Sequence, residues 1–168
     1  MLHHKSHIIL LVLLSIGSLV SCSGKQQRIE FIRLTIEHSK RIPDATVVVE
    51  FMKNGDGAAV HLVSKPMEQS SEWMHTQRDT SFNLGEQQYN ALCKALVNLQ
   101  HHDFSKATVH GLDGVECCLE YGEVNKPVVY KFWSPGYDTE ARGLTEYLNA
   151  CRLLLNMVGL DPHYWLST

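Results

Sequence analysis

The chain has 168 residues with 15 Lys and Arg, 18 Asp and Glu, and a formal net charge of −3. A mildly acidic chain of this kind has no basic footprint for nucleic acid and no polybasic patch to hold anionic lipid. Its length and its 44% hydrophobic residues indicate one domain with a core of its own.

The amino-terminal segment has the parts of a secretory signal. A short polar start with Lys5 precedes an almost entirely apolar run from Ile8 to Val20, and small residues precede the expected cleavage site. The run is shorter than the roughly 20 apolar residues that a membrane-spanning helix needs. The pattern predicts export; an ordinary cleaved signal and an uncleaved anchor helix are the alternatives.

The signal ends in Leu19-Val20-Ser21-Cys22, which resembles the lipobox of bacterial lipoproteins. The resemblance implies that residues 1–21 are a removed signal peptide and that the Cys22 thiol carries a diacylglycerol. It also implies a lipid-anchored protein of the cell envelope, and Ser23 in place of Asp favours the outer membrane. Two or more acyl chains give stable attachment. Residues 22–27 then form a tether, whose five residues after Cys22 span at most about 17 Å, before a single domain at 28–168.

The first part of this domain has the pattern of β-strands. Arg28 to His38 predicts one strand, and Thr46 to Lys53 predicts a second with clear alternation. Asn54-Gly-Asp-Gly57 lies between it and the apolar run Ala58 to Ser64, which indicates a hairpin with a register uncertain by two residues. Glu72 to Phe82 predicts a further, weaker strand.

Two later segments have the spacing of amphipathic helices. Asn83 and Glu86 have the spacing of a capping box, which predicts a helix from there to about Gln100. A second helix is predicted from Asp138 or Thr139 to about Val158, where Gly159 ends it.

Short strands are predicted between the helices, at Ala107 to Leu112, Val115 to Tyr121 and Pro127 to Ser134. The order of elements predicts an α+β domain with a mostly antiparallel sheet of 4–6 strands and two helices on one face, because both helices must bury their apolar stripes. The layout is also similar to small uncharacterised lipoprotein domains of Bacteroidetes-like bacteria, a resemblance that transfers no site.

Four cysteines remain once Cys22 is lipidated: Cys93, Cys117, Cys118 and Cys151. An exported compartment permits disulfides. Cys93 and Cys151 lie on the apolar stripes of the two predicted helices, so a Cys93–Cys151 bond is the disulfide we predict, with buried free thiols as the alternative. Cys117 and Cys118 point to opposite faces of a strand. The spacing of the cysteines predicts no zinc site.

The sequence contains no motif typical of a catalytic site, such as a phosphate-binding loop or a nucleophile elbow. Three features remain for chemistry. The first is the cluster His101, His102, Asp103 and His110. It could bind a metal or transfer protons, but its position favours a solvated helix end and loop. Glu116 and Glu120 are expected on one strand face, as a carboxylate pair for acid–base catalysis or as part of a solvated surface. Cys118 shares that face, and no base is identified to activate it.

Aromatic side chains give the better candidate for a binding surface. Trp133 and Tyr137 lie in the run Phe132-Trp133-Ser134-Pro135-Gly136-Tyr137. Trp73, Tyr164 and Trp165 are expected to join them, since Trp and Tyr are enriched at binding surfaces. The alternative is that Trp133 and Trp165 pack the helices onto the sheet.

Together these patterns predict a membrane-anchored envelope lipoprotein with a non-catalytic binding or structural role. Its partner would be a protein or a polysaccharide, and it would need no cofactor or metal. One alternative is an immunity or inhibitor protein against an envelope-acting toxin or lytic enzyme. The other is a hydrolase of cell-wall or glycan substrates.

Overall fold

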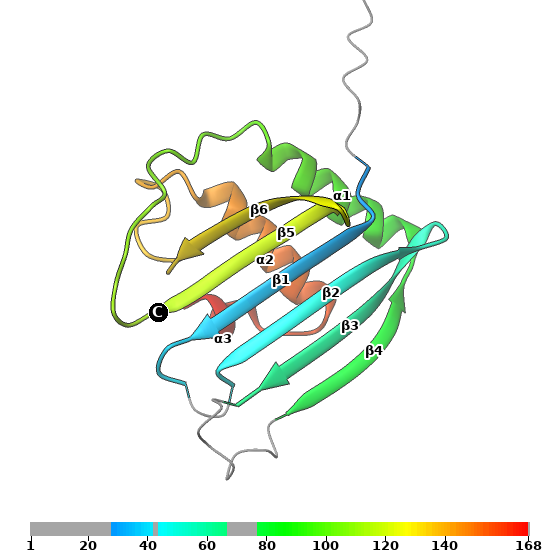
Figure 1. Ribbon diagram of the computed structural model, residues 1–168, viewed down its shortest axis with the longest axis horizontal. Helices are drawn as coiled ribbons and strands as arrows, with labels where there is room; N and C mark the ends of the chain where they lie inside the picture. Colours follow the sequence, from blue (N-terminus) through cyan, green and yellow to red (C-terminus); the bar gives the residue numbers. More distant parts are fainter. Residues whose placement is uncertain (1–27, 42–43, 67–76, 168) are drawn as a thin grey trace, which may run out of the picture.

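The computed structural model describes residues 28–41, 44–66 and 77–167. Within them, six strands form one antiparallel sheet with the order β4-β3-β2-β1-β5-β6 (Figure 1). The strands are β1 (Phe31–His38), β2 (Thr46–Asn54), β3 (Gly57–Lys65), β4 (Arg78–Leu84), β5 (Val115–Glu123) and β6 (Lys126–Trp133). The helices are α1 (Glu86–Leu99), α2 (Thr145–Met157) and the short α3 (Pro162–Leu166).

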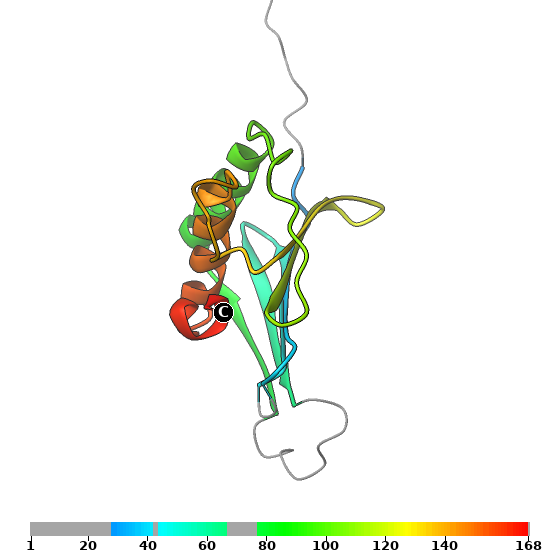
Figure 2. The same cartoon turned by 90° about the vertical axis from the view of Figure 1, so that its left-hand side faces the viewer.

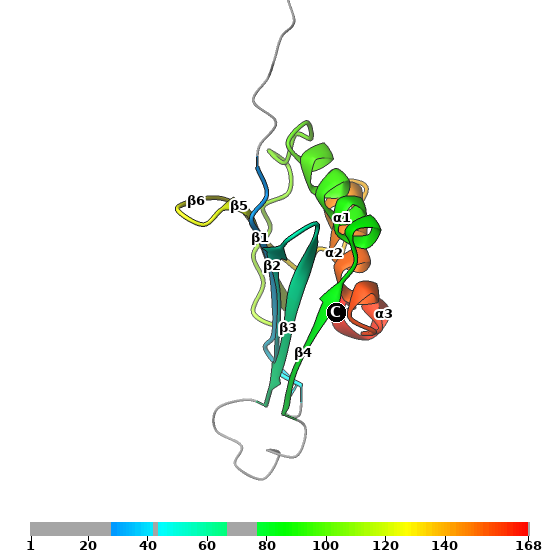
Figure 3. The same ribbon diagram turned by 90° about the vertical axis from the view of Figure 1, so that its right-hand side faces the viewer.

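The helices lie together on one face of the sheet, and the opposite face carries none of the described helices (Figures 2 and 3). The predicted α+β architecture, with its antiparallel sheet and two amphipathic helices on one face, is therefore confirmed. We call the helix-covered side the inner face and the other side the outer face.

Alternation along the strands separates the two faces. On β1, Ile32, Leu34 and Ile36 are fully buried under the helices, whereas Arg33 and Thr35 point to the outer face. The helices contribute leucines and tyrosines to the same core. These buried residues are Tyr89, Leu92, Leu96 and Leu99 of α1, and Tyr147, Leu148, Ala150, Cys151, Leu154 and Leu155 of α2.

Three buried tyrosines connect the two layers through their hydroxyl groups. Tyr89 of α1 donates to the carbonyl of Ile29 (3.0 Å), and Tyr121 of β5 donates to the carbonyl of Leu96 (3.0 Å). In the same way, Tyr147 of α2 donates to the carbonyl of Cys117 on β5 (2.8 Å). Each phenol thus satisfies its own polar group and links a helix to the sheet or to the segment that leads into it.

The register of the β2–β3 hairpin, left open by the sequence, is settled by the loop. Asn54 pairs with Gly57, so Gly55 and Asp56 form a two-residue turn. Gly55 has φ of 60°, a conformation that favours glycine.

Two predicted elements begin at the wrong residues. Asn83 lies in β4 opposite Ala59, so the proposed Asn83–Glu86 cap is incorrect; α1 begins after Gly85, whose N–H donates to the Gln88 side chain (3.3 Å). The strand predicted from Glu72 to Phe82 begins at Arg78 as β4, and residues 72–76 of the predicted span lie outside the described residues.

The second helix begins at Thr145, not at Asp138 or Thr139. Asp138 has φ of 46°, which a right-handed helix does not allow, and the Thr139 hydroxyl donates to the Pro135 carbonyl (2.9 Å). A compact turn therefore precedes α2 (Figure 1).

The strand predicted from Ala107 to Leu112 does not form. The carbonyl of Ala107 accepts two hydrogen bonds from the Arg142 guanidinium instead of pairing with a neighbouring strand. A local apolar pattern was therefore outweighed by a contact from a distant part of the chain.

Candidate binding site

The domain has two opposite ends along β1. The described chain enters at Arg28, close to the β2–β3 and β5–β6 hairpins (Figure 1). His38 ends the strand seven residues beyond Phe31, which corresponds to about 23 Å of extended chain. We call these the Arg28 end and the His38 end.

A cavity of about 720 Å³ lies at the His38 end. Loops and strand ends that are distant in sequence form its walls. It is lined by Glu37, His38, Ser39, Ala45, Thr46, Lys65, Pro66, Gly111, Leu112, Gly114, Glu116 and Trp133. Two of the residues singled out from the sequence, Glu116 and Trp133, are therefore together in one cavity, which we call the His38-end pocket.

An acidic row crosses the outer rim of this pocket. Glu37 on β1 lies directly opposite Glu116 on β5, and Glu116 lies opposite Trp133 on β6. Like charges in opposite positions repel each other. Lys131 offsets this repulsion, because its ammonium lies 2.6 Å from a Glu116 carboxylate oxygen, and this hydrogen bond raises the pKa of Lys131.

Trp133 is held at the pocket by the backbone of the segment before β5. The indole packs so closely against Gly111 and Gly114 that a Cβ atom at either position would overlap the ring. Trp133 itself is half-buried, so part of its surface stays exposed. An aromatic ring beside carboxylates is the composition expected of a site for a polar ligand with apolar faces.

Arg142 supports the pocket from beneath. Its guanidinium is buried, with 4% of the side chain exposed, and burial lowers its pKa. It donates five hydrogen bonds of 2.7–3.1 Å to four backbone carbonyls, those of Ala107, Trp133, Ser134 and Tyr137. One side chain thus joins the segment before β5 to the segment after β6. No pattern along the chain predicted this role of Arg142.

The other predicted aromatic residues divide between the core and the surface. Trp165 is buried with 4% exposed, so it packs the carboxyl-terminal helix α3 onto the domain and is not part of a surface. Its carbonyl accepts a hydrogen bond from Nε2 of His38 (3.0 Å), which sets the tautomer because a carbonyl can only accept. Trp73 lies outside the described residues.

Tyr137 and Tyr164 are exposed, with 52% and 40% of their surfaces accessible. The Tyr164 hydroxyl donates to the Asp44 carboxylate (3.2 Å), and Arg41 lies 4.2 Å from the centre of its ring. Tyr164 therefore uses its hydroxyl and one ring face in contacts within the domain. Neither Tyr137 nor Tyr164 lines the His38-end pocket.

The outer face carries ion pairs along its strands. Arg33 contacts Glu50 (2.6 Å) and Glu120 (3.3 Å), and both pairs are half-exposed. Glu120 is four residues from Glu116 on the same strand, about 13 Å along it. This separation, with a different cationic partner for each carboxylate, does not bring them together as the carboxyl pair of a glycosidase.

The histidine cluster is exposed at the end of α1. Asp103 accepts hydrogen bonds from the backbone and hydroxyl of Ser105 (2.9 and 3.0 Å), and the backbone bond lowers the pKa of Asp103. The ring of His102 lies 6.3 Å from that of Phe104. Among the residues that the structure describes, no group of three or more His, Cys, Asp or Glu side chains could hold a metal ion.

The cysteines are arranged differently from the prediction. All four in the described ranges are free thiols, so the structure contains no Cys93–Cys151 bond. Cys151 contacts Cys117, with 3.7 Å between the two Sγ atoms. Cys93 is half-buried on another side of the helix layer, and burial raises its pKa. Cys118 is half-buried on the outer face.

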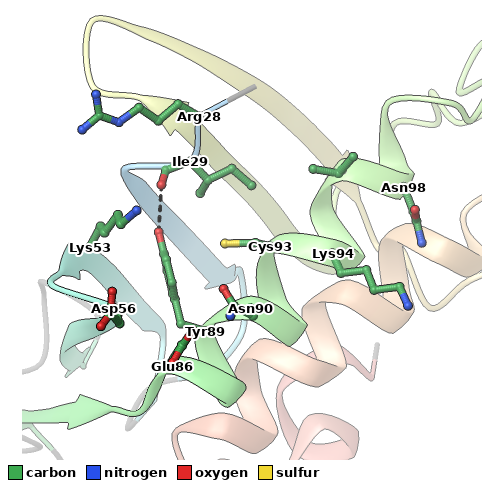
Figure 4. A pocket seen from close by; sticks show the side chains of 11 residues that line it. Arg28, Ile29, Lys53, Asp56, Glu86, Tyr89, Asn90, Cys93, Lys94 and Asn98 are labelled. Atoms are coloured by element: carbon green, nitrogen blue, oxygen red, sulfur yellow. Dashed lines mark hydrogen bonds between the residues drawn. The ribbon is translucent and has the colours of Figure 1, made fainter. Parts of the chain in front are cut away.

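A second cavity, of about 710 Å³, lies at the Arg28 end between α1 and the β2–β3 hairpin (Figure 4). Tyr89 crosses it with its hydroxyl directed at the Ile29 carbonyl, and Cys93 lies beside it. Its walls carry charges of both signs, among them Lys53 and Glu86. No tryptophan among the described residues lines this cavity, in contrast to the His38-end pocket, so it is the weaker candidate for a ligand with apolar faces.

The chain matches no protein-family model, and no curated protein matches it in sequence. Among the described helices, none has the length and apolar character required to cross a membrane.

Proposed function

We propose that the protein is a lipid-anchored lipoprotein of a bacterial envelope that acts as a non-catalytic binding module. Of the two membranes, the outer membrane is the favoured location. The anchor would be Cys22, after removal of residues 1–21. The partner, a protein or a polysaccharide, would engage the His38-end pocket.

The observation that carries this proposal is the position of that pocket. It lies at the opposite end of β1 from Arg28, where the described chain begins. A tether attached at Arg28 and held at a membrane would leave the His38 end facing away from the lipid. The exposed part of Trp133, the adjacent Glu37–Glu116 row and the cavity volume suit recognition of a partner in that direction.

The anchor is tested with Cys22→Ser in the full-length chain. We expect the wild-type protein to sediment with membranes and to have an intact mass that corresponds to an acylated chain starting at residue 22. Cys22→Ser should keep residues 1–21 and lack the acyl mass, and Cys118→Ser is the control for loss of a thiol. An unmodified Cys22 in the native protein would contradict the proposal.

The pocket is tested by chemical crosslinking of the anchored protein in its own membranes, followed by quantitative mass spectrometry. Glu116→Gln should reduce partner recovery about tenfold, the effect of losing one charged contact. Glu123→Gln is a matched control, since it changes an exposed residue of the same strand at the Arg28 end. Equal recovery for both variants would place binding elsewhere.

The immunity or inhibitor hypothesis is a narrower form of the same proposal, in which the partner is a toxin or a lytic enzyme. The hydrolase alternative has less support, because the two carboxylates named from the sequence lie about 13 Å apart along β5, each in its own ion pair.

A further inference from the structure

Two thiols meet inside the core, one from each layer of the fold. Cys117 points from the inner face of β5, and Cys151 points from α2 toward it. Both are 0% exposed, and their Sγ atoms are 3.7 Å apart. A disulfide bond is about 2.05 Å long, so the two sulfur atoms would need to approach by about 1.7 Å.

The surrounding contacts hold these two residues opposite each other. Tyr147, one helical turn before Cys151, donates its hydroxyl hydrogen bond to the carbonyl of Cys117 (2.8 Å). The other two described thiols are elsewhere, since Cys118 lies on the outer face and Cys93 lines the cavity at the Arg28 end. The geometry therefore selects one pair.

We propose that Cys117 and Cys151 are joined by a disulfide bond in the exported protein. The oxidant is the disulfide of an envelope thiol–disulfide oxidoreductase. One thiolate attacks a sulfur of that disulfide, forming a mixed disulfide and releasing one oxidant thiol. The second thiolate then attacks the protein sulfur of the mixed disulfide and releases the other oxidant thiol. Two electrons pass to the oxidant, and the two protons lost by the cysteines are taken up by its thiolates.

Burial determines when this exchange occurs. In the folded domain neither thiol is accessible, and burial raises the pKa of Cys151, which suppresses its thiolate. Oxidation therefore precedes the packing of α2 on β5. The inference rests on the proposed export, because a reducing cytoplasm keeps thiols free.

The bond is tested on the protein purified from its own membranes. The protein is denatured in the presence of N-ethylmaleimide, so that buried free thiols are blocked as well, and the chain is then digested with trypsin without reduction. Cleavage after Lys and Arg leaves Cys93, the Cys117–Cys118 pair and Cys151 on three separate peptides, 79–94, 107–131 and 143–152. We expect a crosslinked species of the last two, lost in Cys117→Ser and retained in Cys118→Ser.

Thermal unfolding supplies an independent measurement. The two cysteines are 34 residues apart, and a loop of this length predicts that a reductant lowers the Tm of the wild-type domain by about 10 °C. Cys118→Ser should show the same decrease, and Cys117→Ser should show none. This comparison of each variant with and without reductant does not depend on how the substitution itself affects folding.

The possible outcomes separate this inference from the proposed function. If residues 1–21 are absent and both Cys117 and Cys151 carry the label, the disulfide is excluded although export occurred. If residues 1–21 are still present, the proposed signal cleavage and lipidation fail. The same full-length chain is then unfolded and refolded with oxidised dithiothreitol: a Cys117–Cys151 crosslink supports the inference, and two labelled thiols overturn it.

Discussion

Replacing Arg142 by Met should separate the two segments that the guanidinium joins. The substitution preserves most of the aliphatic stem but removes the five hydrogen bonds that four backbone carbonyls accept from the guanidinium, although the Ser134 carbonyl keeps the Tyr137 N–H (2.9 Å). At about 1 kcal/mol for each carbonyl, the free energy of unfolding should decrease by about 4 kcal/mol. That is a large part of the 5–15 kcal/mol typical of a domain.

Equilibrium unfolding in urea measures this decrease. With an m value of about 2 kcal/mol/M, the midpoint should move down by about 2 M. Arg142→Lys retains the charge but not the planar fork, so it should recover less than half of the loss. Arg152→Met is the control, because Arg152 is exposed on α2 and donates one bond of 3.3 Å to Asn149. If Arg142→Met lowers the free energy of unfolding by less than about 1 kcal/mol, the argument that Arg142 joins the two segments is refuted.

Two further predictions concern the His38 end. Burial lowers the pKa of His38 from 6.5 to about 4, so the unfolded chain binds the proton more readily and stability should fall as the pH decreases from 6.5 to 4. His38→Gln, which keeps an N–H for the Trp165 carbonyl, should reduce this acid sensitivity in urea titrations at several pH values, whereas exposed His163→Gln should not. Gly111→Ala should displace the Trp133 indole, because the added methyl group overlaps it, and should shift the tryptophan fluorescence maximum; an unchanged near-UV and emission spectrum would contradict this packing.

Local patterns predicted the elements whose contacts are local. The β2–β3 hairpin combines an Asn-Gly-Asp-Gly turn with alternation on both sides, and α1 and α2 have complete apolar stripes. Each of these signals lies within about 20 residues, where periodicity and turn chemistry act together. The layer architecture followed from them because both stripes need the same sheet face.

The remaining features depend on contacts between distant segments. Arg142 and the carbonyl of Ala107 are 35 residues apart, and no periodicity indicates that an arginine will be buried among carbonyls. The same contact occupies the carbonyl of Ala107, the first residue of the strand expected at 107–112. Cys151 faces Cys117 and not Cys93. This contact could not be predicted, because a helix stripe indicates which residues are buried but not which strand lies opposite them.

The candidate site was predicted in part. Trp133 and Glu116 were both named from the sequence, but as members of two separate hypotheses, and β5–β6 pairing brings them side by side. Glu37 was not named, since its role depends on β1 pairing with β5 across 79 residues of chain. The glycines beside Trp133 could have been found only with the fold known.

The central place of β1 in the sheet has a mechanical consequence. The strand pairs with β2 on one side and with β5 on the other, and both ladders extend along most of its length. A pull on the amino-terminal segment enters at Arg28 and acts along the strand axis, at right angles to the hydrogen bonds. Both ladders are then sheared together instead of being unzipped one bond at a time, so the first strand of the domain resists extraction by force along most of its length.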